Sequence, residues 1–336
     1  MMRLSIGQCV LLAMLAAGVC AAHAQSAPVR DRMPERIVAP YIDMARLPND
    51  LAKIHRESGL RYFTLAFVNA GADCTPVWPG ALPVSADKLW AMNVRKLRRQ
   101  GGDVIIAFGG YDGTELAQVC NDAATLAAAY EQVLAKYKPI ALDFDIEHLA
   151  IEDQPSIDRR SQALRLLAER NPSVCISLTL PATPAGLTEK SMNVLASAMA
   201  TGARIDLVNL MTMDYGRFAE TKQMGDNAIA AAQAATVQLQ QLGMHARLGI
   251  TPMLGVNDVA GETFTLTDAA ALTTFARQNT NVALLAYWSI ARDNGSCSAQ
   301  LSPLCSGVQQ TKWQFATIFT AFVEQQPRKE IVFKRK

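Results

Sequence analysis

One short segment, ALDFDIEHLA at residues 141–150, combines acidic and apolar side chains in strict alternation. The carboxylates Asp143, Asp145 and Glu147 occupy every second position, and bulky apolar residues fill the positions between them. Successive side chains of a β-strand point to opposite faces of the sheet. The alternation therefore predicts a strand whose apolar side chains face a layer of helices and whose three carboxylates line an enclosed interior.

Similar apolar runs recur along the chain, separated by amphipathic helical patterns. The expected strands are 37–42, 62–68, 104–110, 140–146, 174–180, 205–213, 247–254 and 282–290. Examples of the expected helices are 86–100, 113–136, 156–170, 188–200, 226–242, 268–278 and 308–323. Nearly continuous apolar strands are typical of a parallel sheet that is buried on both faces. Eight such strand–helix units predict an α/β fold, a (β/α)8 TIM barrel in a single domain.

A doubly wound open sheet is the competing fold. It would usually carry a glycine-rich phosphate turn after its first strand. The segment that follows the first expected strand, PYIDMARLPND at 40–50, contains no glycine. No Ser/Gly-rich linker or internal repeat divides the chain, which favours one domain.

The acidic strand also predicts an active site. In barrels of this class the carboxyl ends of the strands carry the catalytic residues, and Glu147 stands at that end. Carboxylates in an interior cannot all ionise, so their pKa values should be pushed apart and at least one proton should be shared. A solvated acidic edge is the alternative, but the apolar residues between the carboxylates disfavour it. A divalent-metal site with His148 is a second alternative, although strand parity places His148 on the opposite face.

The N-terminus resembles a secretory signal peptide. Residues 1–24 combine Arg3, the apolar run CVLLAMLAAGVCAA and the small residues Ala22 and Ala24 at an A-x-A cleavage site. We therefore expect a secreted protein, extracellular or periplasmic, whose catalytic domain spans 25–336. The apolar run is too short for a good membrane span, and no later stretch is long and apolar enough to suggest one.

An oxidising compartment changes the expected state of the cysteines. We expect local disulfides between Cys74 and Cys120 and between Cys297 and Cys305. Cys175 lies in an apolar strand and should remain a buried free thiol. The chain has no C-x-x-C pair, and its four histidines show no ligand spacing, so we expect no structural metal.

Composition excludes a strongly electrostatic role. The 336 residues are 50% hydrophobic and 18% charged, and the formal net charge is +2. These values give no basic patch for nucleic acid. We expect neither a nucleic-acid nor a membrane partner, and a monomer.

Several motifs together resemble the glycoside hydrolase family 18 chitinases over residues 35–325. LDFDIE at 142–147 is similar to the family's D-x-D-x-E strand, with Ile140 where a longer form has another Asp. AFGG at 107–110 resembles S-x-G-G, with Ala107 in place of Ser. LMTMDYG at 210–216, ITPMLGVNDV at 250–259 and AYWSIARDN at 286–294 resemble the later strands, with Ala291 in place of a usual Asn.

The resemblance implies roles for particular residues. Glu147 would protonate the leaving oxygen and then activate water, Asp145 would orient the substrate's acetamide group, and Asp143 would share a proton with Asp145. Tyr215 would donate its hydroxyl to the acetamide carbonyl. No cofactor or metal is implied, because the acetamide itself is the nucleophile in this family. The residues implied or expected to bind substrate are Trp288, Met213, Asp214, Tyr41, Gly109 and Gly110.

The expected function is hydrolysis of β-1,4 links in chitin or N-acetylglucosamine oligomers. Tyr41 and Trp78 are expected to extend the cleft. An endo-β-N-acetylglucosaminidase or a peptidoglycan-directed hydrolase of the same family remains open, as does a divalent-cation-dependent phosphodiesterase on the same barrel. A chitin-binding protein without activity is a further alternative, which the acid at Glu147 disfavours.

Overall fold

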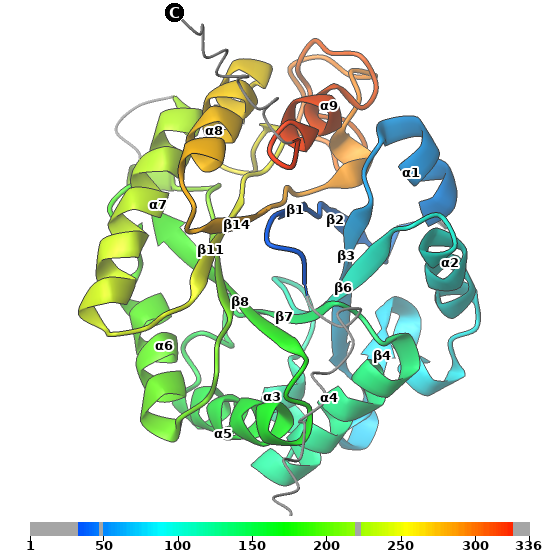
Figure 1. Ribbon diagram of the computed structural model, residues 1–336, viewed down its shortest axis with the longest axis vertical. Helices are drawn as coiled ribbons and strands as arrows, with labels where there is room; N and C mark the ends of the chain where they lie inside the picture. Colours follow the sequence, from blue (N-terminus) through cyan, green and yellow to red (C-terminus); the bar gives the residue numbers. More distant parts are fainter. Residues whose placement is uncertain (1–32, 47–49, 219–222, 325–336) are drawn as a thin grey trace, which may run out of the picture. The chain divides into compact units, whose positions relative to one another are not determined.

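A computed structural model describes residues 33–46, 50–218 and 223–324. The expected signal peptide, residues 1–24, lies outside the described residues. Parallel strands form an inner ring and helices surround it, as seen end-on in Figure 1. This arrangement confirms the α/β class and the predicted alternation of strands with helices.

Eight parallel strands form the ring in the described part of the chain, with β1 and β2 counted as one interrupted strand. In chain order they are β1 (Ile37–Val38), β2 (Tyr41–Asp43), β3 (Tyr62–Ala70), β6 (Asp103–Gly109), β7 (Ala141–Asp145), β8 (Cys175–Thr183), β10 (Leu207–Met211), β11 (Arg247–Thr251) and β14 (Val282–Leu285). Short strands outside the ring extend its loops: β4 (Pro76–Trp78), β5 (Leu82–Pro83), β9 (Gly186–Leu187), β12 (Gly255–Val256) and β13 (Thr263–Phe264).

The interrupted first strand closes the ring. β1 pairs in parallel with β14, and β2 pairs in parallel with β3. Pro40, which has no N–H to donate, lies between the two halves. Backbone bonds continue across the gap, because the N–H of Ala39 donates to Leu285 O at 3.0 Å and that of Thr64 donates to Pro40 O at 2.9 Å. The segment therefore joins the last strand to the second, as the barrel prediction requires (Figure 1).

The outer helices agree with most of the predicted ranges. They are α1 (Leu51–Ser58), α2 (Leu89–Arg98), α3 (Leu116–Val119), α4 (Ala123–Tyr137), α5 (Gln154–Arg170), α6 (Glu189–Thr201), α7 (Met224–Gln241), α8 (Leu266–Gln278) and α9 (Gln314–Thr320). Side chains of Ser/Thr/Asp type cap several of them by accepting a backbone N–H of the first turn; these caps are Asp50, Asp122, Thr188 and Thr265.

Two predicted details were wrong or missing. The single helix expected over 113–136 is two helices, α3 and α4, because Cys120 is extended and Asp122 begins α4 as its N-cap. Helix α1 was not predicted, although Asp50 and Gly59 mark its ends: Asp50 accepts from the N–H of Lys53, and Gly59 adopts a φ of 78°.

The sheet separates two apolar layers. Phe144 of β7 points outward and packs against Phe108 of β6 and Tyr130 of α4, with ring centroids 5.0 and 4.8 Å apart. The inner layer contains a few large side chains and many small ones. The small ones are Ala39, Ala66, Ala107, Ala141, Ala283 and Ala286. Because residues 141 and 144 lie in different layers, Asp143 and Asp145 share the inner side with Ala141, as the alternation predicted.

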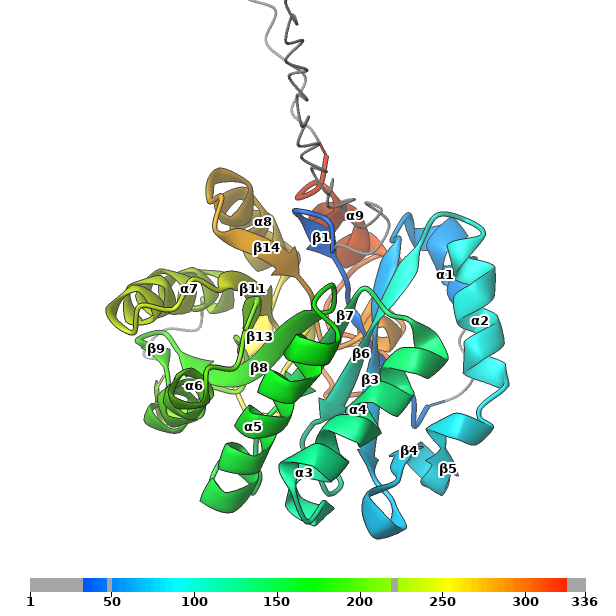
Figure 2. The same cartoon turned by 60° about the horizontal axis from the view of Figure 1, so that its bottom comes forward.

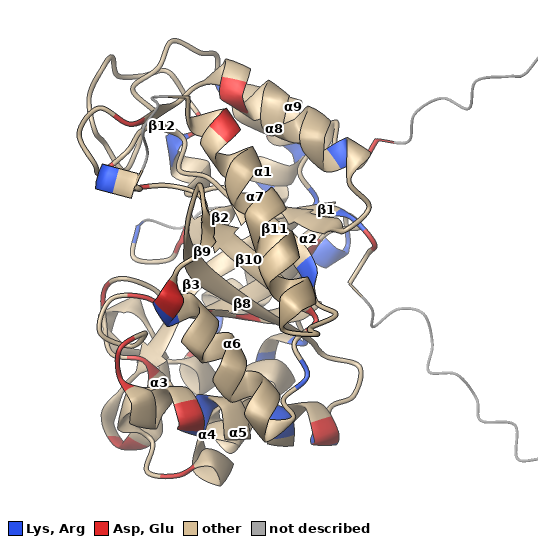
Figure 3. Ribbon diagram, turned by 90° about the vertical axis from the view of Figure 1, so that its left-hand side faces the viewer, with Lys and Arg blue, Asp and Glu red and all other residues tan. Residues whose placement is uncertain are grey.

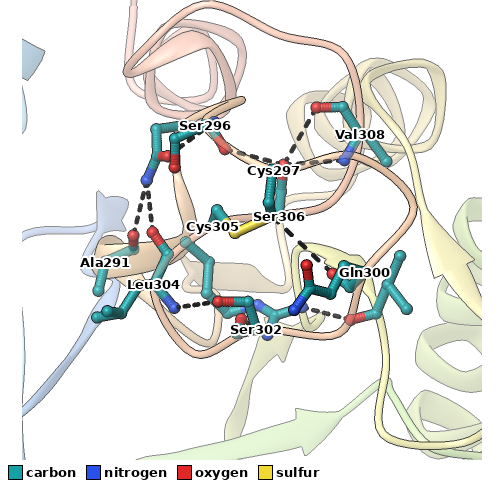
Figure 4. Close-up of a disulfide and its surroundings, with 12 residues drawn as sticks. Ala291, Ser296, Cys297, Gln300, Ser302, Leu304, Cys305, Ser306 and Val308 are labelled. Atoms are coloured by element: carbon teal, nitrogen blue, oxygen red, sulfur yellow. Dashed lines mark hydrogen bonds between the residues drawn. A yellow bond between two sulfur atoms is a disulfide. The ribbon is translucent and has the colours of Figure 1, made fainter.

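Both expected disulfides are present, which confirms the pairings of Cys74 with Cys120 and of Cys297 with Cys305. Cys175 is the free cysteine of the described chain, as expected, but it is half-buried rather than fully buried. The second disulfide closes the loop after β14 that Figure 4 shows, where the Asn294 side-chain amide donates to the carbonyls of Ala291 and Leu304. These bonds fix the chain beyond the end of the last barrel strand.

The outer surface formed by the helices carries charges of both signs on the side that Figure 3 shows. Figure 3 shows Lys and Arg residues interspersed with Asp and Glu residues along the helices and loops of that side. Among the described residues, no helix has the length and apolar composition that a membrane crossing requires.

Candidate active site

The three predicted carboxylates lie together at the carboxyl end of β7. In the parallel register, Asp143 stands beside Ala107 and Ser177, and Asp145 stands one step further along. Asp143 is 2% exposed and Asp145 is 6% exposed, whereas Glu147 follows the end of the strand and is half-buried. The two aspartates are therefore enclosed, and the glutamate is the member of the set that solvent or a ligand can reach.

Asp143 is held by a chain of hydrogen bonds across the barrel interior. The hydroxyls of Tyr41 and Thr179 donate to its carboxylate at 2.9 and 2.8 Å. The Asn209 amide donates to Thr179 Oγ1 at 2.9 Å, and the Thr251 hydroxyl donates to Asn209 Oδ1 at 2.8 Å. Burial raises the pKa of Asp143 to about 6, although these donors favour the ionised form and partly offset it.

Asp145 has fewer partners than its neighbour. Its Oδ1 atom is buried and has no hydrogen-bond partner among the described residues. Burial raises the pKa of Asp145 well above its usual range, and the charges of Glu147, Asp143 and Glu115 raise it further. Asp145 therefore keeps a proton that an isolated aspartic acid would lose.

The surroundings of Glu147 raise its pKa, so that it holds a proton near neutral pH. Burial raises its pKa to about 7, with additional contributions from the charges of Asp214 and Asp112. A carboxylic acid with this pKa can donate a proton at neutral pH and can take one back when ionised. Glu147 thus has the chemistry of a general acid and base.

Gly109 and Gly110 have backbone conformations that other residues rarely adopt, with φ values of 87° and 80°. A Cβ atom at Gly109 would lie 2.2 Å from the carbonyl oxygen of Asp145, and one at Gly110 would lie 2.5 Å from the ring of Phe67. A side chain would therefore clash with the Asp145 backbone at Gly109 and with Phe67 at Gly110. Contact of these glycines with a substrate stays a prediction.

Trp288 follows β14 and lies half-buried at the same end of the barrel. Its ring stacks on that of Phe67, with centroids 5.8 Å apart and an interplanar angle of 17°. The peptide bonds Ala66–Phe67 and Trp288–Ser289 are both cis. The sequence did not single out Phe67, which lies two-thirds of the way along an ordinary apolar strand. Only the barrel brings it against Trp288.

The segment after β10 contains the next predicted residues. Asp214 has a φ of 50° and its Oδ1 accepts the N–H of Val259 at 3.0 Å. Met213 is half-buried beside it. The backbone N–H groups of Tyr215 and Gly216 donate to the carboxylate of Glu262 at 3.1 and 2.7 Å. The loop before β13 therefore holds the loop after β10 in place.

Tyr215, the implied donor to the substrate's acetamide group, follows β10 and is buried. Its side chain is 3% exposed and belongs to the large apolar cluster between the sheet and the helices. Its hydroxyl is buried and has no hydrogen-bond partner in the described ranges. Its assignment as a donor to substrate stays a prediction.

Three expectations need correction. Tyr41 is 2% exposed and is a partner of Asp143, so it does not extend an open cleft. Trp78 is also 2% exposed, and its indole N–H donates to the hydroxyl of Tyr137 at 2.6 Å. His148 lies beyond the end of β7, where strand parity no longer applies, and its ring stacks on that of Tyr111 with centroids 4.7 Å apart. Tyr111 was not singled out in the sequence.

Within residues 33–46, 50–218 and 223–324, no three His, Cys, Asp or Glu side chains are grouped as a metal ion would require.

Comparisons with known proteins point to one family, although no family model matches the chain. The sequence is 36% identical over 317 residues to the "Probable bifunctional chitinase/lysozyme" of Escherichia coli (strain K12), which covers 87% of this chain. The chain spans about a third of that relative, 35% of its length.

Two solved structures agree over almost their whole lengths. The catalytic domain of the hyperthermophilic chitinase from Pyrococcus furiosus is 35% identical, with a TM-score of 0.77, over 87% of this chain and 96% of that chain. Catalytic-site mutants of active domain 2 of that organism's thermostable chitinase, complexed with chito-oligosaccharides, are 34% identical with a TM-score of 0.78 and the same coverage. With the D-x-D-x-E strand in its expected place, the chain belongs to the family 18 chitinases of the glycoside hydrolases.

Proposed function

We propose that this protein hydrolyses the β-1,4 linkages of chitin or N-acetylglucosamine oligomers with retention of anomeric configuration. The observation that carries the proposal is the state of Glu147. It is half-buried at the carboxyl end of β7, just past two enclosed aspartates, and its pKa is raised to about 7. An acid that is protonated near neutral pH and reachable from outside is what cleavage of a glycosidic bond requires.

The proposed reaction has two steps. In the first, Glu147 gives its proton to the leaving oxygen while the bond from that oxygen to the anomeric carbon breaks. The oxygen of the substrate's own acetamide forms a bond to the same carbon from the opposite face. Asp145 hydrogen-bonds the acetamide group and orients it for attack. It shares its proton with Asp143 of the same strand, so that negative charge on Asp145 stabilises the cation as it forms. In the second step water attacks the anomeric carbon, Glu147 takes the water's proton, and the acetamide bond to carbon breaks.

Aromatic side chains supply the binding surface in this proposal. The stacked pair of Trp288 and Phe67 lies half-buried at the carboxyl end of the barrel. A flat apolar face of this kind suits one face of a pyranose ring. The Pyrococcus furiosus relative has been crystallised with chito-oligosaccharides, which supports the same ligand class here.

Secretion forms part of the proposal. Two disulfides are typical of a protein that folds outside the cytoplasm. Together with the signal-like residues 1–24, they support an extracellular or periplasmic location. Fractionation of cells that express the full chain, with detection of the processed protein, would test it.

The proposal is tested by hydrolysis of N-acetylglucosamine oligomers with wild type and Glu147→Gln, with and without a chelator. Products are read by mass, and the anomer formed first is read by NMR. We expect chelator-insensitive cleavage that yields the β-anomer, and a loss of roughly 10²–10⁴ in kcat for the variant. Near-wild-type turnover in Glu147→Gln, or binding without cleavage by wild type, would refute the proposal.

A second candidate substrate is peptidoglycan. The Escherichia coli relative is named as a probable bifunctional chitinase/lysozyme, and peptidoglycan also contains N-acetylglucosamine. The same two proteins incubated with purified cell-wall sacculi separate the candidates. Release of muropeptides by wild type without cleavage of chitin oligomers would favour this substrate.

A further inference from the structure

A buried ion pair between Arg160 and Glu115 lies close to β7, the strand of Asp143 and Asp145. It has no role in the reaction described above. Arg160 of α5 donates through Nε to Glu115 Oε1 at 2.6 Å, and a second guanidinium nitrogen contacts Glu115 Oε2. The side chains are 1% and 2% exposed, respectively. Burying two charges this completely is costly even when they are paired, so their position calls for an explanation.

Glu115 of this pair lies close to Asp145, because both residues border Gly109. Glu115 Cγ lies 3.8 Å from the place that a Cβ atom of Gly109 would occupy, and the carbonyl oxygen of Asp145 lies 2.2 Å from the same point. The N–H of Gly110 donates to that carbonyl oxygen at 3.0 Å. Glu115 and the backbone of Asp145 thus approach the same point beside Gly109, where glycine has no side chain.

Glu115 is itself fixed in place from several sides. It is the N-cap of α3, and its N–H donates to Gln118 Oε1 at 3.0 Å. Cys120 ends α3 and is bonded to Cys74 in the loop after β3. Helix α3 packs on both α4 and α5, which lie side by side in Figure 2. The Glu115 carboxylate therefore has little freedom to move away from β7 and Asp145.

We propose that Glu115 and Arg160 are positioning residues of the active site, and that their ion pair fixes the backbone and the protonation state of Asp145 through the Gly109 contact. This assignment rests on the proposed function, because it gives Asp145 its importance. Neither residue reaches the substrate in this proposal; each acts through Asp145.

The charges around Asp145 determine the sign of the effect. Asp143 and Glu147 face it from its own strand and the turn beyond, and Glu115 faces it from the segment after β6. Glu147 in turn is faced by Asp214 and Asp112. Each of the three carboxylates around Asp145 favours its protonated form, and removal of the Glu115 charge should therefore favour ionisation.

The test is Glu115→Gln, read by ¹³C-carboxyl NMR titration of Asp145, with Asp145→Asn used to assign the signal. We expect the Asp145 midpoint to fall by about one pH unit or more, because Arg160 then stays charged without its counterion. The acid limb of kcat/KM on N-acetylglucosamine oligomers should move in the same direction. The matched control is Glu169→Gln, which removes the partner of Arg165 in an exposed pair on the same helix and should leave the Asp145 titration unchanged.

A paired variant keeps the test decisive if Glu115→Gln does not fold. Glu115→Leu combined with Arg160→Met removes both charges, a replacement that buried pairs commonly tolerate. Its Asp145 midpoint should also lie below that of wild type. An unchanged midpoint in a folded variant that lacks the Glu115 carboxylate would overturn the proposal. The titration needs no substrate, so a failure of the chitinase assignment would leave it readable and would appear only in the activity assay.

Discussion

Replacing Glu147 by Gln should stabilise the protein at alkaline pH while it removes the proposed acid. Burial and the neighbouring carboxylates raise the pKa of Glu147 from its ordinary 4.5 to about 7. The native state therefore binds this proton more tightly than the unfolded chain does. The contribution of this bound proton to the free energy of unfolding is fully present below pH 4.5 and is lost as the pH rises through about 7. A glutamine, which does not titrate, loses nothing over this range.

The size of the effect follows from the pKa difference. Each pH unit between the two pKa values corresponds to about 1.36 kcal/mol, so ionisation of Glu147 costs the native state ~3 kcal/mol once the pH is well above 7. At pH 5 less than ~1 kcal/mol of this has been lost, and at pH 8 nearly all of it. The free energy of unfolding of Glu147→Gln minus that of wild type should therefore increase by ~2 kcal/mol between pH 5 and pH 8.

The assay is urea-induced unfolding at both pH values, followed by tryptophan fluorescence with the disulfides intact. The comparison of two pH values cancels any pH-independent difference in packing between glutamate and glutamine. Glu189→Gln is the matched control, because Glu189 is exposed at the start of α6. A difference between variant and wild type that is the same at pH 5 and pH 8 would refute the reasoning, since Glu147 would then titrate alike in the folded and unfolded chain.

Three further outcomes are expected. In wild type, kcat/KM on N-acetylglucosamine oligomers should fall about tenfold per pH unit above about pH 7, because Glu147 must be protonated to act as acid; a flat profile to pH 9 would contradict this. Thr179→Val should cost ~1–3 kcal/mol of unfolding free energy in urea titrations, because it removes a hydroxyl that donates to Asp143 and accepts from Asn209; it should also raise the pKa of Asp143, which NMR would detect. Trp288→Ala should raise KM roughly tenfold, equivalent to ~1.4 kcal/mol, with a smaller change in kcat, and an unchanged KM would remove Trp288 from the binding surface.

Most of the barrel was predictable because its signals are local. A short apolar run bounded by turns and rich in β-branched residues favours a buried strand, and the observed strands fall within or near the predicted ranges. The errors arose where a local signal was overlooked. Asp122 and Asp50 are ordinary N-caps, and reading them as such would have split the helix at 113–136 and found α1.

The site was predictable in part. The period of two along 142–147 placed Asp143 and Asp145 on the inner side correctly. The same rule failed for His148, because the strand ends at Asp145 and the chain turns. Tyr41 and Trp78 looked like cleft residues because aromatic residues near strand ends often are. Their burial depends on Asp143 and Tyr137, which lie far away in the sequence.

The sequence alone determined most of the strands and helices, which face of the acidic strand turns inward, and which cysteines pair, because each of these follows from side-chain alternation or from neighbouring segments. Only the tertiary structure decided which groups set the protonation of the carboxylates. Asn209 reaches Tyr41 across 168 residues of sequence, and Arg160 reaches Glu115 across 45. Such contacts exist only when the ring is closed, and the burial that raises the pKa values of Asp143, Asp145 and Glu147 comes from the same closure.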